Sequence, residues 1–119
     1  MIKGIGIDAV ELPRIARIIE EKPSFAKRVL TKHEHTYFDS LPKHRKIEFL
    51  GGRFACKEAF SKAFGTGIGK VTFQDLEILT TDKGAPTFTK APWPLEAVHV
   101  SITHTDTTAF AQVLLEQNR

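Results

Sequence analysis

The chain has 119 residues, 41% of them hydrophobic and 26% charged, which predicts one globular domain over residues 1–119 and excludes a disordered protein. Its net charge of +3 favours anionic partners, but the charge is low and no recognition motif is visible, so we expect no nucleic-acid binding. No apolar run approaches a membrane span, residues 1–4 lack the layout of a signal peptide, and the single Cys56 cannot form an internal disulfide, so we expect a cytoplasmic protein without membrane association.

The first predicted element is a short strand over residues 4–8, Gly-Ile-Gly-Ile-Asp. Ile5 and Ile7 share one face of this strand, and the glycines between them allow another backbone to approach closely. Asp8 ends the strand and needs a partner, because an unpaired buried carboxylate is costly. On local grounds the partner is a helix N-terminus or a turn, and the alternative is a metal ion.

Two helices that carry arginines on their polar faces follow the strand. The first is predicted over residues 13–21, where isoleucines recur on the inner face and Arg14 and Arg17 lie on the outer face. A short second helix begins at Ser24 and directs Arg28 outward. These arginines either bind an acidic partner or simply keep the helices soluble.

The sequence next predicts the N-termini of two further helices. Thr31 and Glu34 have the spacing of a capping box, which predicts a helix from this point. Pro42 breaks the chain, and residues 43–46 place a basic run at the next helix start, where cations oppose the macrodipole. These basic side chains are either simply solvated or bind a phosphate group. Gly51-Gly52 weakens the helix, so we expect a close packing contact there.

The central helix is predicted over residues 53–64. Its apolar residues recur at helical spacing on one face: Cys56, Ala59, Phe60, Ala63 and Phe64. Glu58 and Lys62 lie four residues apart on the opposite face, where an exposed ion pair is worth about 0.2–0.5 kcal/mol. The helix ends at a turn over residues 65–69, Gly-Thr-Gly-Ile-Gly, which either connects flexibly or presents backbone N–H groups to phosphate.

The last part of the chain reads as β-structure. Residues 76–80 and 86–89 are predicted strands of a hairpin that turns at residues 82–84, Asp-Lys-Gly. Residues 98–103 alternate in polarity, and the strand from Thr107 onward is apolar on both faces, which predicts a central, well-covered strand. A first strand, a helical middle and an antiparallel meander together predict an α+β fold with helices packed on an antiparallel sheet.

Three segments of the chain match, in order and spacing, the sequence pattern of one protein family. These are residues 4–8 with Glu11 and Arg14, residues 53–67, and residues 101–104. Together with the hairpin at residues 82–86, they closely resemble holo-acyl carrier protein synthase, the small bacterial-type 4′-phosphopantetheinyl transferase. The resemblance covers nearly the full chain. It implies an enzyme that moves the phosphopantetheine arm of coenzyme A to a serine of apo-acyl carrier protein and releases adenosine 3′,5′-bisphosphate. It further implies a role in fatty acid synthesis, and a homotrimer with active sites between subunits.

The resemblance also assigns roles to individual residues. Asp8 and Glu58 match the family's ligands for a divalent metal, usually Mg²⁺, and we count Lys62 with them as catalytic. Arg14 matches a family position for carrier docking, and we expect Arg17 and Arg28 to act with it. We expect coenzyme A contacts at Arg45, Arg53, Ser61, Lys62, Gly65, Thr66, Gly67 and His104, with Arg45, Arg53 and His104 supplied by a neighbouring subunit. The alternative for His104 is a turn histidine without a role.

Two questions stay open at this point. The base that activates the acceptor serine is either Glu58 or a metal-bound water near Asp8. The same residues also fit two other functions: a phosphohydrolase that uses water as acceptor, and a non-enzymatic module that binds an acidic protein or nucleotide through residues 14–21.

Overall fold

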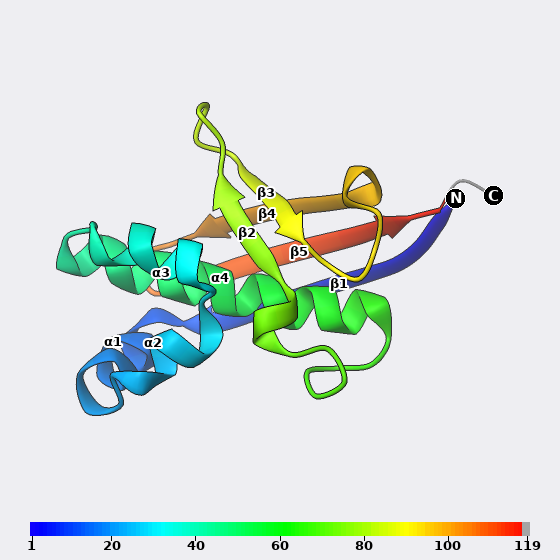
Figure 1. The fold of residues 1–119 in the computed structure, drawn as a ribbon. Coiled ribbons are helices and arrows are strands. Elements are labelled where there is room, and N and C mark those ends of the chain that lie inside the picture. Colours follow the sequence, from blue (N-terminus) through cyan, green and yellow to red (C-terminus); the bar gives the residue numbers. More distant parts are fainter. Residues whose placement is uncertain (118–119) are drawn as a thin grey trace.

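A three-stranded antiparallel sheet in the order β1–β5–β4 forms the base of the fold (Figure 1). The computed structural model of the protein describes residues 1–117. β1 spans Ile2–Glu11, β4 spans Val98–His104 and β5 spans Thr108–Glu116. β5 is therefore the central strand, as predicted, and the first strand is longer than the pattern over residues 4–8 indicated.

Four helices lie between β1 and the remaining strands. They are α1 (Leu12–Glu21), α2 (Ser24–Val29), α3 (Lys32–Asp39) and α4 (Lys43–Phe64). The predicted capping box begins α3, because the Thr31 side chain accepts from the backbone of Glu34 and the Glu34 side chain accepts from the backbone of Thr31. None of these helices is both long and apolar enough to cross a membrane within the described residues.

The C-terminal half begins with a separate two-stranded sheet. β2 (Glu77–Thr80) and β3 (Pro86–Lys90) pair antiparallel and project beyond α4 (Figure 1), and they are flanked by the 3₁₀ helices η1 (Phe73–Asp75) and η2 (Leu95–Ala97). The hairpin turns at Gly84, whose φ of 85° suits glycine. The order of strands and helices confirms the predicted α+β fold.

The helix α4 runs unbroken for 22 residues through Gly51 and Gly52. A Cβ atom on Gly51 would lie 2.7 Å from Cδ2 of Leu12, and one on Gly52 would lie 3.1 Å from Cγ2 of Ile102. The glycines thus let α1 and β4 pack against α4, which confirms the close contact expected there. The partners are side chains rather than backbone.

The closest approach in the fold is between β1 and α4. A Cβ atom on Gly4 would lie 2.0 Å from the carbonyl oxygen of Ala63, and one on Gly6 would lie 2.0 Å from that of Ala59. The approach predicted from these glycines is confirmed. Because strand residues alternate between faces, Asp8 lies on the same side as Gly4 and Gly6 and faces α4.

The other face of the sheet is open. The residues of β5 that face α4 are buried, from Ala109 to Leu115, but Phe110 on the opposite face is 36% exposed. Ile5 and Ile7 of β1 are 58% and 61% exposed. The expectation that β5 is well covered on both sides is therefore wrong for a single chain, because α4 covers one face and nothing in residues 1–117 covers the other.

Candidate active site

Asp8 and Lys62 form an ion pair across the β1–α4 contact. Lys62 Nζ donates to Asp8 Oδ1 at 2.9 Å and to the carbonyl oxygen of Ile7 at 3.1 Å. The pair remains accessible, because 19% of the Asp8 side chain and 51% of the Lys62 side chain are exposed. The sequence predicted an ion pair between Glu58 and Lys62, but the structure pairs Lys62 with Asp8, since glycines bring β1 against this turn of α4.

Glu58 completes this cluster one helical turn before Lys62. Partial burial raises the pKa of Glu58, the nearby Asp8 carboxylate raises it further, and Lys62 opposes the shift. Asp8 on a strand and Glu58 on a helix are a suitable pair of ligands for Mg²⁺, which usually takes one or two carboxylates and completes its shell with phosphate and water. Residues 1–117 contain no cluster of three or more His, Cys, Asp or Glu side chains that could hold a metal ion.

The glycine turn after α4 is held by one carbonyl group. Gly65 and Gly67 have positive φ values of 95° and 68°. The backbone N–H groups of Gly65, Thr66 and Gly67 all donate to the carbonyl oxygen of Ser61, at 3.0, 3.2 and 3.2 Å. The turn therefore caps the C-terminus of α4 through glycines in the left-handed conformation. Its three N–H groups are engaged by the Ser61 carbonyl group rather than presented to a phosphate.

Two side chains of α4 face the interior in this region. Ser61 is fully buried and its hydroxyl donates to the carbonyl oxygen of Glu58 at 2.7 Å, so its side chain does not present a donor at the surface. Cys56 is also fully buried, as predicted, and burial raises the pKa of its thiol to about 12. Cys56 is thus a structural residue of the core.

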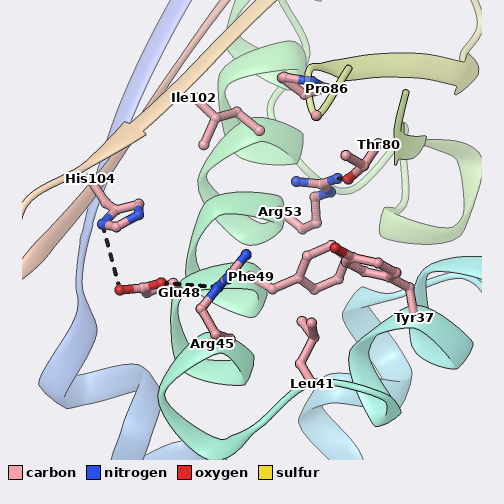
Figure 2. Close-up of a pocket in the computed structure, with 11 residues that line it drawn as sticks. Tyr37, Leu41, Arg45, Glu48, Phe49, Arg53, Thr80, Pro86, Ile102 and His104 are labelled. Carbon is pink, nitrogen blue, oxygen red and sulfur yellow. Dashed lines mark hydrogen bonds and ion pairs between the residues drawn. The ribbon is translucent and has the colours of Figure 1, made fainter. Parts of the chain in front are cut away.

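A separate pocket of about 500 Å³ lies between α3, α4, the β2–β3 hairpin and the end of β4 (Figure 2). It brings together Arg45, Arg53 and His104, three of the residues expected to contact coenzyme A. Glu48, which the sequence did not suggest, lies between two of them: its carboxylate is 3.6 Å from Arg45 Nε and 3.8 Å from His104 Nδ1. The pocket is therefore basic, with one carboxylate that orients its cations.

Arg53 is the most firmly held cation of this pocket. Its Nε donates to the carbonyl oxygen of Ile78 at 2.9 Å, and its Nη2 donates to the Thr80 hydroxyl at 3.0 Å. Its guanidinium also lies 4.3 Å from the centre of the Phe49 ring. Figure 2 shows Arg53 directed toward the hairpin and Arg45 directed toward Glu48. Arg53 thus anchors the hairpin to α4 while it lines the pocket.

The pocket and the Asp8 cluster are distinct places on one chain. Asp8, Glu58 and Lys62 are absent from the lining of the pocket among the described residues. A single chain therefore brings the predicted site residues together as two groups, one acidic with a lysine and one basic.

A groove of about 700 Å³ between α1 and α2 contains part of the predicted carrier surface. Arg14 and Arg28 line it, together with the apolar Ile18 and Phe25, whereas Arg17 is not part of the lining. The Arg28 guanidinium lies 5.8 Å from the centre of the Phe25 ring. Phe25 is half-buried and packs against the core beside the groove, so both its basic rim and its apolar side come from residues of α1 and α2.

The relatives of this chain have a consistent activity. A family model described as the 4′-phosphopantetheinyl transferase superfamily matches residues 4–114. The chain is 62% identical over 116 residues to a holo-[acyl-carrier-protein] synthase of Enterococcus faecalis and 52% identical over 118 residues to one of Anoxybacillus flavithermus, and each match covers 98% of both chains.

Solved structures agree with these relatives. The fold matches a holo-(acyl-carrier-protein) synthase from Bacillus anthracis in complex with CoA (3′,5′-ADP), with a TM-score of 0.91, 45% identity and 99% of each chain covered. It also matches the Helicobacter pylori enzyme in complex with coenzyme A, with a TM-score of 0.80, 32% identity, and 94% of this chain and 99% of that chain covered. The chain therefore belongs to the 4′-phosphopantetheinyl transferase superfamily, and within it to the holo-[acyl-carrier-protein] synthases.

Proposed function

We propose that the protein transfers the 4′-phosphopantetheine arm of coenzyme A to a serine of apo-acyl carrier protein. The serine oxygen forms a bond to the phosphorus atom that carries the pantetheine arm, and the bond from that phosphorus to adenosine 3′,5′-bisphosphate breaks. The observation that carries this function is the accessible Asp8–Lys62–Glu58 cluster in a chain that belongs to the holo-[acyl-carrier-protein] synthases.

The cluster provides the charges that such a transfer needs. Mg²⁺, when bound by Asp8 and Glu58, supplies neutralisation of the phosphoryl oxygens. Among residues 1–117 the ammonium group of Lys62 engages two of its three donors, so it can also donate to a phosphate oxygen. The proton of the serine hydroxyl would go either to Glu58, when this carboxylate is free of the metal, or to a water held near Asp8.

The basic pocket is proposed to bind the phosphorylated nucleotide end of coenzyme A. Arg45, Arg53 and His104 are the charged donors for it, and the Glu48 carboxylate keeps two of them in place. The pocket does not include the Asp8 cluster, so one coenzyme A molecule would use the cluster of one subunit and the pocket of its neighbour. The exposed Ile5, Ile7 and Phe110 give the sheet an apolar face that supports a homotrimer.

The acyl carrier protein is proposed to bind at the α1–α2 groove. The groove combines the basic side chains of Arg14 and Arg28 with an apolar floor at Ile18 and Phe25. Charged rims and apolar centres are typical of protein interfaces, and an acidic partner fits the sign of this charge. Such an enzyme would act in the cytoplasm and supply holo-carrier for fatty acid synthesis.

A transfer assay tests the proposal directly. The protein is incubated with coenzyme A, Mg²⁺ and apo-acyl carrier protein, and the carrier is weighed by mass spectrometry, with Asp8→Ala as the matched control. A carrier that gains one phosphopantetheine with the wild type but not with the control supports the function. Free pantetheine phosphate with unmodified carrier would instead identify a phosphohydrolase, and binding without turnover would identify a binding module.

A further inference from the structure

A buried ion pair joins α3 to α4 away from both proposed substrate sites. The Lys57 and Glu34 side chains are fully buried, and Lys57 Nζ lies 2.7 Å from Glu34 Oε1. Lys57 is also the largest of the fully buried side chains in the described part of the chain. Neither residue stood out in the sequence as a candidate for function.

Lys57 holds the end of α2 and η1 against α4. Besides Glu34, its ammonium donates to the carbonyl oxygen of Val29 at 2.7 Å and to that of Phe73 at 3.0 Å. All three ammonium protons are therefore engaged. Val29 is the last residue of α2 and directly follows Arg28 of the α1–α2 groove. The position of this groove relative to α4 thus depends on Lys57.

Glu34 holds β2 in a similar way. Its Oε1 accepts from Lys57 and from the Thr31 N–H at 2.8 Å, and its Oε2 accepts from the Ile78 N–H at 2.7 Å. The carbonyl group of Ile78 accepts from Arg53 Nε, so both backbone polar groups of this β2 residue are bound by side chains of α3 and α4. Glu34 therefore contributes to the position of the hairpin that lines the basic pocket.

Stability is a poor explanation for such a pair. Replacing a buried ion pair with apolar residues of similar volume is often neutral or stabilising, because the charges lose their hydration, whereas removing one partner alone is costly. Apart from their mutual bond and the bonds to η1 and to the Thr31 N–H, the pair instead contacts two different segments, α2 through Lys57 and β2 through Glu34. Each of these segments lines one of the two proposed substrate sites.

We propose that Glu34 and Lys57 are positioning residues with divided roles. Lys57 sets α2 for the carrier protein, and Glu34 sets β2 for coenzyme A. The division rests on the proposed function in its assignment of the groove and the pocket. It goes beyond that function because neither residue touches a substrate, and because each governs a different Michaelis constant.

Two single variants test the division by kinetics. Glu34→Gln keeps acceptors for Lys57 and Thr31 but turns an amide N–H toward the Ile78 N–H, so we expect the KM for coenzyme A to rise about fivefold and the KM for carrier to stay within about twofold. Lys57→Met releases Val29 and should show the opposite pattern. Because neither variant changes Asp8, Glu58 or Lys62, kcat should stay within about twofold in both. Equal increases in both constants in both variants would overturn the division.

Lost stability is controlled with two further variants. Val113→Ala opens a cavity under β5, a strand to which neither Lys57 nor Glu34 is hydrogen-bonded, so it should leave both KM values unchanged although it destabilises the fold. The double variant Lys57→Met with Glu34→Leu removes both buried charges and should fold even if Lys57→Met does not. We expect it to raise both KM values. A folded double variant with both KM values at the wild-type level would show that the pair does not position either site.

Hydrogen exchange tests the same contacts without turnover. Glu34→Gln should speed exchange in β2 and β3, and Lys57→Met should speed exchange at the end of α2 and in η1. Exchange that increases uniformly in both variants would overturn the inference. Failure of the proposed function looks different, because the wild type would then leave the carrier unmodified while the regional exchange patterns remain.

Discussion

Two of the lysines of α4, Lys57 and Lys62, each pair with a carboxylate of another element in opposite surroundings. Lys57 and Glu34 are fully buried, and their hydrogen-bonding groups are engaged by the protein. Lys62 and Asp8 lie at the surface, and the Lys62 side chain is half exposed with one ammonium donor uncommitted. The two distances are similar, at 2.7 and 2.9 Å, so distance alone does not separate structural from chemical roles. The two roles are separated by solvent access and by whether the described residues leave an ammonium donor available.

The largest effect should come from removing the accessible carboxylates. Asp8→Ala or Glu58→Ala should abolish Mg²⁺-dependent transfer, because each removes one of two charged oxygen ligands, and both variants should remain folded. Glu58→Gln should be almost as damaging, since it keeps the shape and removes the charge. The measurements are transfer by mass spectrometry and folding by circular dichroism. Near-normal turnover of either alanine variant at ordinary Mg²⁺ would falsify the assignment.

The next effect compares the two lysines by stability. Lys57→Met leaves the Glu34 carboxylate buried without its cationic partner and should cost about 3–5 kcal/mol of the free energy of unfolding. Lys62→Met removes only a surface ion pair and should cost less than about 1 kcal/mol. Urea unfolding of both variants without ligands measures the difference. Equal losses would contradict the separation drawn between the two pairs.

For the rate of transfer the order of the two lysines should be reversed, with the larger effect at Lys62. Charge-assisted hydrogen bonds contribute about 1.5–3 kcal/mol, so Lys62→Ala should lower kcat/KM for coenzyme A by roughly ten- to a hundredfold. Steady-state kinetics at fixed saturating carrier gives this value. Lys3→Ala, which removes another exposed lysine of similar shape, is the control and should change kcat/KM little. A loss of similar size in the control would point to general charge rather than to the site.

A smaller effect is expected at the α1–α2 groove. Arg14→Glu should raise the KM for carrier several-fold and flatten its salt dependence, because exposed charges mainly steer association. Coenzyme A binding by calorimetry should be unchanged. Arg17→Glu tests how far the docking surface extends, since Arg17 lies on the same helix but outside the groove lining, and it should raise the carrier KM less than Arg14→Glu does. An unchanged carrier KM for Arg14→Glu at low and moderate salt would move the docking surface to the basic residues 43–46.

The smallest effect concerns the pH dependence of stability. The pKa of Glu58 is raised in the folded protein, so between the unfolded and folded pKa values the folded state holds more protons and stability falls as pH rises. Glu58→Gln lacks this titration. With a chelator present, the stability of Glu58→Gln relative to wild type should therefore increase with pH across this window and then level off. A constant difference in urea midpoints would show that the surroundings of Glu58 do not shift its pKa.

Local patterns predicted much of this fold, and long-range contacts account for what they missed. The capping box at Thr31 and Glu34 was correct, yet the second oxygen of Glu34 binds Ile78, a residue far along the chain that no local pattern connects to it. The bare outer face of β5 was also missed, because apolar residues on both faces look the same whether a helix of the same chain or another subunit covers them.

The site was predicted to a similar extent. Resemblance to a family pointed to Asp8, Glu58 and Lys62, and the structure places Asp8 and Lys62 in contact. The partner of Lys62 was not predicted, since the i,i+4 rule considers only one helix whereas the glycines of β1 decide which carboxylate comes nearest. Arg45 is an i,i+3 neighbour of Glu48 on α4 that the sequence could have indicated, whereas His104 comes into reach of Glu48 only after β4 packs beside α4.

The contact between β1 and α4 has a consequence for how this protein tolerates sequence change. At Gly4 and Gly6 even a methyl group would enter the space of a helix carbonyl, so any other amino acid must push the strand away from the helix. The separation of Asp8 from Lys62 would widen with it. Two positions that carry no reactive atom are thus as intolerant of replacement as the charged residues beside them, and a survey of mutational effects would mark them as essential although they take no part in the chemistry.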